Sequence, residues 1–203
     1  MLVDGYYVLQ QYRSSLECPF ASKCGLAGEK VKFVRGEGDA TSGIMFIGRD
    51  PGSDENAQGR PFVGMAGRKL RQDIEEVFGS VSDVYLTNLV KCHTPGNRGP
   101  DYFEIKRCRA HLHGEILTIL PKVVVCLGTE VSEYMLSKGY MSTITKVPMS
   151  QMSGKVYRIP LIYKDIDTHI KVIPCYHPSP RNFQYYPDIL EAIRRAKQAI
   201  SEP

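Results

Sequence analysis

The chain lacks any apolar run long enough to cross a membrane, and its first residues lack the apolar core of a signal peptide. It also lacks internal repeats and low-complexity linkers. These absences argue against a membrane protein, a secreted protein and a repeat array. We expect a cytoplasmic protein with no membrane partner. Its 203 residues suit one domain with a substantial core, spanning 1–203.

A strong excess of charge of one sign is also missing. The chain has 26 Lys and Arg against 22 Asp and Glu, which gives a net charge of +4. A weakly basic balance is compatible with a nucleic-acid partner but does not require one. Basic residues gather at Arg68–Arg71, Lys106–Arg109 and Arg194–Lys197, and a solvated helix face is the simpler interpretation of any one of these clusters.

The order of apolar segments predicts the fold class. Four runs have the composition of buried strands: Ile44–Ile47, Val84–Thr87, Val123–Leu127 and Lys171–Pro174. Four segments have helical spacing: Ala66–Phe78, Tyr102–Leu120, Val131–Leu136 and Pro187–Ile200. Strands that alternate with helices indicate a sheet covered on both faces. We predict an α/β fold, a three-layer α/β/α arrangement around a central, mostly parallel, four-stranded sheet, with a short hairpin near Val156–Tyr163.

Three of these strands end in polar segments rich in Gly and Pro. The first runs into GRDPG, the second ends at Asn88 and the last runs into YHPSPRN. In sheets of this kind ligands bind beyond the carboxyl ends of the strands. We therefore expect Asp50, Asn88 and His177 to converge on one site. The third strand, which ends before Gly128, has only an ordinary strand-to-helix turn.

Six cysteines in a chain expected inside the cell argue against a disulfide framework. Cys126 and Cys175 lie in apolar strands, where cysteine packs as a small hydrophobic residue. The other four are either unliganded thiols or ligands of one metal centre, zinc or [4Fe–4S], and their spacing alone does not choose.

Together these pieces resemble the uracil-DNA glycosylases of the iron–sulfur type, called family 4. The matching stretches follow the family's order and cover nearly the whole chain: FVRGEGDATSGIMFIG, GRDPGSDENAQGRPFVGMAGRKL, LTNLVKCHTPGNRGP, CRAHLHGEILTILPKVVVCLGTEV and VIPCYHPSPRN. The resemblance implies a DNA-repair enzyme that flips uracil out of DNA and hydrolyses its N-glycosidic bond, leaving an abasic site. Its partner would be uracil-containing DNA, single- or double-stranded, and it would act as a monomer in a prokaryotic or viral nucleoid.

The resemblance also implies a cofactor. Four cysteines of the family hold a [4Fe–4S] cluster, and this role falls on Cys18, Cys24, Cys92 and Cys108, with an N-terminal segment supplying the first two. The family usually spaces its first two cysteines as C-x2-C, whereas residues 19–23 separate them here.

The first motif departs from family 4 as well. The family usually has G-E-A-P-G, but Arg49 and Asp50 replace the glutamate and the alanine. The resulting G-x-D-P resembles family 1, whose G-Q-D-P-Y-H motif carries the catalytic aspartate at this place. A carboxylate at Asp50 would orient water and stabilise the positive charge that develops on the sugar. A neutral imidazole at His177 would favour departure of the pyrimidine anion. From residue type alone, a turn-capping aspartate and a structural histidine are more common.

The resemblance further implies residues that bind uracil and DNA. The uracil-binding group is Gly48, Arg49, Glu55, Phe62 and Asn88. The amide of Asn88 would pair with N3–H and O4 of uracil, the ring of Phe62 would stack on the base, and Glu55 or its loop would exclude the methyl group of thymine. The expected DNA contacts are Asn97, Arg98, Ser179 and Arg181, and either Arg181 or Phe183 would fill the gap in the base stack. Further candidates for phosphate contacts are Lys91, Lys106, Arg107 and Arg109.

Two other functions stay open at this point. One is a non-catalytic DNA-binding module that keeps the glycosylase fold and the cluster, since Arg49 replaces a glutamate of the family. The other is an iron–sulfur or zinc protein with an unrelated redox function. A cavity shared by Asp50, Asn88 and His177 would favour the enzyme.

Overall fold

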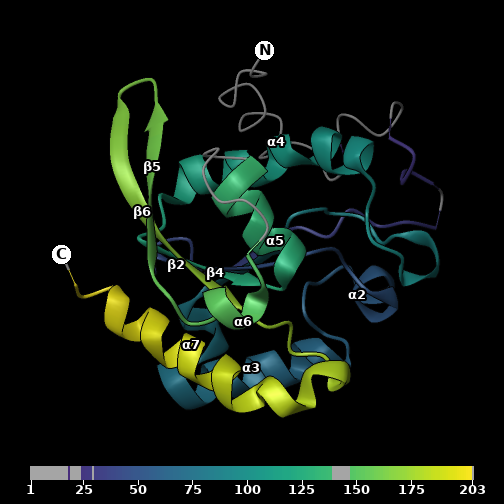
Figure 1. The fold of residues 1–203 in the computed structure, drawn as a ribbon. Coiled ribbons are helices and arrows are strands. Elements are labelled where there is room, and N and C mark those ends of the chain that lie inside the picture. Colours follow the sequence, from purple (N-terminus) through teal and green to yellow (C-terminus); the bar gives the residue numbers. More distant parts are fainter. Residues whose placement is uncertain (1–17, 19–23, 29, 139–146, 203) are drawn as a thin grey trace.

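A six-stranded sheet forms the middle layer of the protein (Figure 1). The computed structural model describes residues 18, 24–28, 30–138 and 147–202. The predicted N-terminal cluster-binding segment lies mostly outside these residues. The strands run in the order β1-β3-β2-β4-β6-β5. Their bounds are β1 Glu37–Gly38, β2 Ile44–Gly48, β3 Tyr85–Asn88, β4 Val123–Leu127, β5 Tyr157–Tyr163 and β6 Ile166–Cys175.

The four predicted strands are the four parallel ones, β3, β2, β4 and β6. The predicted count of four is too low because two antiparallel strands, β1 and β5, extend the sheet at its edges. Strand β1 has only two residues, too few for an alternating pattern. Strand β5 belongs to the expected hairpin. Its partner β6 begins at Ile166, earlier than predicted, because Asp167, Thr168 and His169 are polar and exposed and so lack the apolar pattern of a buried strand.

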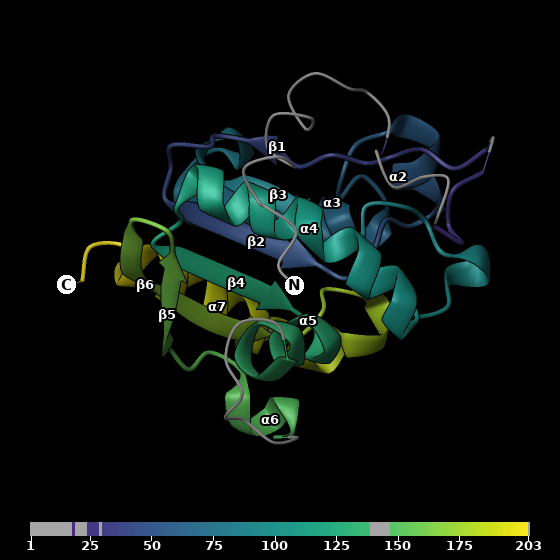
Figure 2. The ribbon, with the colours of Figure 1, turned by 90° about the horizontal axis from the view of Figure 1, so that it is seen from above.

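Helices cover both faces of the sheet, as predicted (Figure 2). Their bounds are α2 Ser53–Gln58, α3 Met65–Phe78, α4 Tyr102–Ile119, α5 Thr129–Glu133, α6 Met149–Met152 and α7 Tyr186–Ala199. A π-helical turn, Tyr134–Lys138, continues α5. Three 3-10 segments lie in loops of the described chain: η2 Val81–Asp83, η3 Pro95–Asn97 and η5 Pro180–Tyr185. The label η4 marks the π turn. None of the described helices is both long enough and apolar enough to span a bilayer.

Alternation along the strands divides the core into two halves. In β2, Met45 and Ile47 point to the half that packs against α4, whereas Ile44 and Phe46 point to the half that packs against α3 and α7. Helix α4 starts at a capping box in which Asp101 accepts from the Glu104 amide at 2.8 Å and Glu104 accepts from the Asp101 amide at 2.7 Å. The chain therefore enters α4 with a fixed geometry, close to the carboxyl ends of the strands.

Candidate active site

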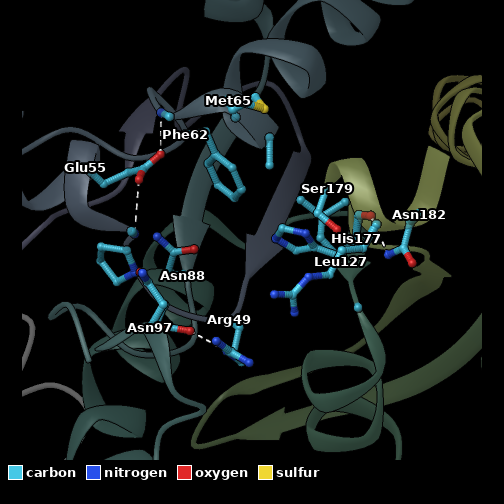
Figure 3. Close-up of a pocket in the computed structure, with 18 of the residues that line it drawn as sticks. Arg49, Glu55, Phe62, Met65, Asn88, Asn97, Leu127, His177, Ser179 and Asn182 are labelled. Atoms are coloured by element: carbon cyan, nitrogen blue, oxygen red, sulfur yellow. Dashed lines mark hydrogen bonds and ion pairs between the residues drawn. The ribbon is translucent and has the colours of Figure 1, made fainter. Parts of the chain in front are cut away.

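A pocket of about 1000 Å³ opens at the carboxyl ends of the parallel strands (Figure 3). Asp50, Asn88 and His177 all line it, although they come from three separate segments. Parallel pairing continues just past the strands, since the Val90 amide donates to the Arg49 carbonyl at 2.9 Å. This pairing holds the chain after β2 beside the chain after β3. The fold thus gathers the three strand ends around one cavity.

Asn88 and Phe62 line the floor of the pocket, and both side chains lie against Gly48. Asn88 is only 4% exposed, and within the described residues its side-chain amide makes no hydrogen bond. A Cβ on Gly48 would lie 2.4 Å from Asn88 Oδ1 and 2.8 Å from Phe62 Cζ. Only glycine therefore leaves room for this amide and this ring. A buried amide with unused donors and acceptors is suited to recognising a polar planar ligand.

Phe62 reaches the pocket through a strained backbone. Its φ of 55° lies in the left-handed region, which is uncommon for a bulky residue. Arg71 on α3 holds this conformation by donating to the Phe62 carbonyl at 2.8 Å. Gly67 allows α3 to approach, because a Cβ there would lie 2.2 Å from the Phe62 carbonyl carbon. Strain that the surroundings hold in place is typical of functional sites.

Glu55 organises the wall between Gly52 and Gly64. Its carboxylate is buried and accepts from three backbone amides: Gly52 at 3.0 Å, Val63 at 2.8 Å and Gly64 at 2.7 Å. These bonds close the loop around α2 onto itself. The side chain lines the pocket, but its oxygens are already used by the loop (Figure 3).

Asp50 is held by two partners. Arg49 forms an ion pair with one carboxylate oxygen, and the Thr94 hydroxyl donates to the other at 2.8 Å. Arg49 also contacts Glu130 at 3.2 Å and the Arg98 carbonyl at 3.4 Å. The Asp50 side chain is 6% exposed. A carboxylate fixed in this way presents a negative charge at a defined point of the cavity.

The imidazole of His177 faces the pocket, and within the described residues it makes no hydrogen bond. Its backbone carbonyl is fixed by the Ser179 amide and the Asn182 side chain, both at 2.8 Å. Burial lowers the pKa of His177, and the nearby Arg49 guanidinium lowers it further, against smaller opposite effects of Asp50 and Glu55. The imidazole is therefore neutral at pH 7 and keeps one N–H to donate.

Cys18 and Cys24 are half-buried, whereas Cys92, after β3, and Cys108, on α4, are buried in the core between α4 and the sheet. Burial raises the pKa of Cys92 to about 12, with further contributions from Cys18 and Cys24. Burial also raises the pKa of Cys108, and Cys92 and Cys18 act on it in the same direction. Cys18 Sγ also lies 3.3 Å from Nε2 of His111, one turn after Cys108 on α4. The Lys91 amide donates to Cys108 Sγ at 3.1 Å.

Among the described residues, no set of three His, Cys, Asp or Glu side chains is arranged to hold a single metal ion. The donor set near Cys92 is nevertheless rich in sulfur, and thiolates are the usual ligands of iron–sulfur clusters. Cys126 and Cys175 are fully buried in β4 and β6, apart from this group.

The sequence profile of the uracil DNA glycosylase superfamily matches residues 35–198. The chain belongs to this superfamily. A Type-4 uracil-DNA glycosylase of Sulfurisphaera tokodaii is 39% identical over 183 residues, which cover 89% of this chain and 78% of the relative. Those of Saccharolobus solfataricus and Archaeoglobus fulgidus are 37% and 34% identical, over 88% and 89% of this chain and 81% and 86% of their own lengths. The matched region contains the whole pocket.

The rim of the pocket in this superfamily member carries three of the four residues expected to contact DNA. Asn97, Ser179 and Arg181 line the cavity. Arg98 does not line it: its guanidinium donates to Glu104 at 2.6 and 2.8 Å, and only its carbonyl faces Arg49. Phe183, the other expected stack filler, is 74% exposed.

The sequence analysis missed two residues that shape the site. Thr94 is fully buried and fixes Asp50, and only its position in the polar segment after β3 hinted at a role. Glu130 lines the pocket and pairs with Arg49. The turn after Gly128, interpreted as an ordinary turn, is thus part of the wall. The suggestion that Lys91 contacts phosphates is wrong, because its ammonium is completely buried.

Proposed function

We propose that this protein excises uracil from DNA by hydrolysing the N-glycosidic bond, and that an abasic site remains. The observation that carries the proposal is the pair of polar side chains, Asn88 and His177, that face one cavity without hydrogen bonds to other described residues. A pyrimidine that has left the base stack exposes carbonyl oxygens and an N–H that can form hydrogen bonds with both side chains. The relatives' names and the superfamily support the same activity.

Asn88 selects the base in this proposal. Its amide donates to O4 of uracil and accepts from N3–H, whereas cytosine presents the opposite pattern at these atoms. Phe62 stacks on the ring and excludes water from one face. The loop that Glu55 closes, Gly52–Gly64, stands beside the pyrimidine and leaves no room for the methyl group of thymine.

His177 and Asp50 carry the chemistry. The N1–C1′ bond breaks with its electron pair passing to the base, and the N–H of neutral His177 stabilises the charge on the departing pyrimidine. Asp50, a family 1-like aspartate in a family 4-like chain, stabilises the cationic sugar and orients the water that adds to C1′. That water gives up a proton as the sugar hydroxyl forms; the Asp50 carboxylate accepts it, and it passes through solvent to the uracil anion, so that neutral uracil and the abasic sugar result. Arg49 fixes Asp50, and Gly48 leaves room for Asn88 and Phe62.

We further propose that Cys18, Cys24, Cys92 and Cys108 hold a [4Fe–4S] cluster. The mutual proximity of their thiols and the Lys91 amide directed at Cys108 support this donor set. When bound, the cluster ties the N-terminal segment to the segment between β3 and α4 and supplies no redox step. Residues 1–203 would form a single domain that acts as a monomer in the cytoplasm, on nucleoid DNA.

DNA would cross the rim of the pocket. Asn97, Ser179 and Arg181 are placed to contact the backbone beside the flipped nucleotide. Arg98, whose guanidinium pairs with Glu104, would approach DNA from outside the pocket. Arg181 or Phe183 would fill the gap left in the stack. Phosphate contacts of this kind make affinity fall as salt rises.

The test is alkali cleavage of an end-labelled oligonucleotide that carries one uracil. The wild type should yield a strand break at the uracil, and thymine and cytosine controls should stay intact. Asp50→Asn and His177→Ala should each lose about 10²–10⁴-fold in rate, whereas Glu76→Gln on the distant face of α3 should not. Wild-type rates in both site variants would refute the assigned roles.

A further inference from the structure

An unusual surface patch lies on the first two turns of α4. Tyr102 and Phe103 are 69% and 63% exposed, although both are large aromatic residues. Their ring centroids are 5.5 Å apart in an edge-to-face arrangement, and Lys106 Nζ lies 5.8 Å from the centre of the Tyr102 ring. Arg107, one helical turn after Phe103, is exposed as well. These four residues form what we call the aromatic–basic patch.

The fold does not need these rings. Helix α4 attaches to the core through its opposite side, where Cys108, Leu112 and Ile116 are buried. Its first turn is already secured by the capping box of Asp101 and Glu104. Two adjacent exposed rings cost solvation without contributing to packing, which is typical of a binding surface.

The patch is tied to the rim of the pocket. Asn97 lines the cavity, and the neighbouring Arg98 carbonyl accepts from Arg49 at 3.4 Å. The Arg98 guanidinium in turn donates two hydrogen bonds to Glu104 in the first turn of α4. Figure 2 shows the loop before α4 at the end of the sheet toward which the β4 arrow points. Asn97 and Arg98 thus connect the pocket with the first turn of α4, which carries the patch.

The chemistry of the patch selects the partner. Lys106 and Arg107 suit phosphates, and exposed rings suit unpaired bases, whose flat faces stack on aromatic side chains whatever the sequence. The nearest carboxylate within the helix, Glu104, is already neutralised by Arg98. Bases inside a duplex are already stacked on each other, so their faces cannot stack on Tyr102 and Phe103.

We propose that the aromatic–basic patch binds unpaired nucleotides of the strand that continues from the pocket. The enzyme would thereby favour uracil in single-stranded DNA. This inference rests on the proposed function for its biological meaning, but binding to the patch is measurable without uracil and without catalysis.

The chain contains no tryptophan, so one introduced indole reports on one place. Phe103→Trp should be quenched when uracil-free oligothymidylate is added. Ile162→Trp is the matched control, because Ile162 is 71% exposed on β5, away from the pocket. Quenching confined to the first variant supports the proposal, and equal quenching or none at all overturns it.

A second measurement uses affinity. Tyr102→Ala/Phe103→Ala should weaken binding to the same oligonucleotide about 5- to 150-fold per lost stacked base, with little change for duplex DNA. Lys106→Gln/Arg107→Gln should reduce the salt slope by about 0.7 for each lost phosphate contact. An equal loss on single and double strands would overturn the stacking role. So would competition by polyglutamate as strong as that by DNA, or binding of phosphatidylserine vesicles in place of DNA.

Failure of this inference differs from failure of the proposed function. The double alanine variant should still excise uracil at saturating substrate, because the pocket is untouched. If the wild type excises no uracil but the Phe103→Trp signal still responds to oligothymidylate, nucleotide binding at the patch is supported and the proposed function is refuted. If excision is normal but the Phe103→Trp fluorescence does not change, only nucleotide binding at the patch is refuted.

Discussion

The ammonium of Lys91 and the carboxylate of Glu115 form a fully buried ion pair, with Nζ 2.6 Å from Oε2. Lys91 also donates to the Thr87 hydroxyl at 2.5 Å and to the Asn88 carbonyl at 2.7 Å. Its own backbone amide donates to Cys108. One residue thus connects the end of β3, which carries the pocket-facing amide of Asn88, with helix α4 and with Cys108.

Lys91→Met should be strongly destabilising. It leaves the carboxylate of Glu115 buried without its cation, which typically costs about 3–5 kcal/mol. Urea unfolding followed by circular dichroism measures the free energy of unfolding. Lys91→Met/Glu115→Gln should recover much of the loss, since a neutral amide can still accept from Thr87. A double variant no more stable than the single one would contradict this account.

Gly48→Ala should remove activity and leave the protein folded. The new Cβ would collide with Asn88 Oδ1 and Phe62 Cζ. A shift of about 1 Å in such groups can cost on the order of 10²-fold in rate. Single-turnover excision on a uracil oligonucleotide measures the effect. Gly28→Ala is the control, because its Cβ would meet only Val31 at 3.9 Å, and similar rates in the two variants would speak against the crowded floor.

Excision should stay constant from pH 8 down to about pH 6.5 and fall only at lower pH. The pKa of His177 is lowered from the usual 6.5, so the neutral, donating form persists until the pH passes below this reduced value. Arg49→Gln removes a cation that lowers this pKa, so the acid limb of the pH–rate profile should move to higher pH. Arg49→Lys should leave the limb in place. An unchanged limb in Arg49→Gln would exclude this electrostatic coupling.

If the four cysteines hold a [4Fe–4S] cluster, as proposed, loss of one of them should remove iron from the protein. Cys92→Ala is expected to abolish the visible thiolate-to-iron absorption and to lower the melting temperature. Cys126→Ala is the matched variant, since Cys126 is equally buried but lies within β4, apart from the thiol group. Iron content after anaerobic purification decides the matter, and full iron occupancy in Cys92→Ala would disprove the ligand assignment.

The central fold follows from local patterns in the sequence. Runs such as Val123–Leu127 are apolar throughout because both faces of a parallel strand are buried. The helical stripe of Pro187–Ile200 matches α7 almost to the residue. The edge strands β1 and β5 carry no such signal, since one is very short and the other contains exposed residues and Pro160.

The site was less predictable than the fold. Strand ends indicated where Asp50, Asn88 and His177 would meet, because parallel strands direct their carboxyl ends to one edge. Contacts between residues far apart in the chain give no local sequence pattern. The contact of Arg49 with Glu130 is an example, because it joins two distant segments. Burial of Lys91 was also hidden, since its position in a polar segment suggests solvent and only the fold brings Glu115 to it.

The way Glu55 fastens its loop limits how substrate choice can change. Three amides depend on one carboxylate, so this side of the cavity cannot widen by small increments. Replacing Glu55 would release the whole segment at once. A broader range of damaged bases would more easily arise on the opposite side, where Ser179 and Asn182 line the cavity and the Glu55 carboxylate holds nothing (Figure 3).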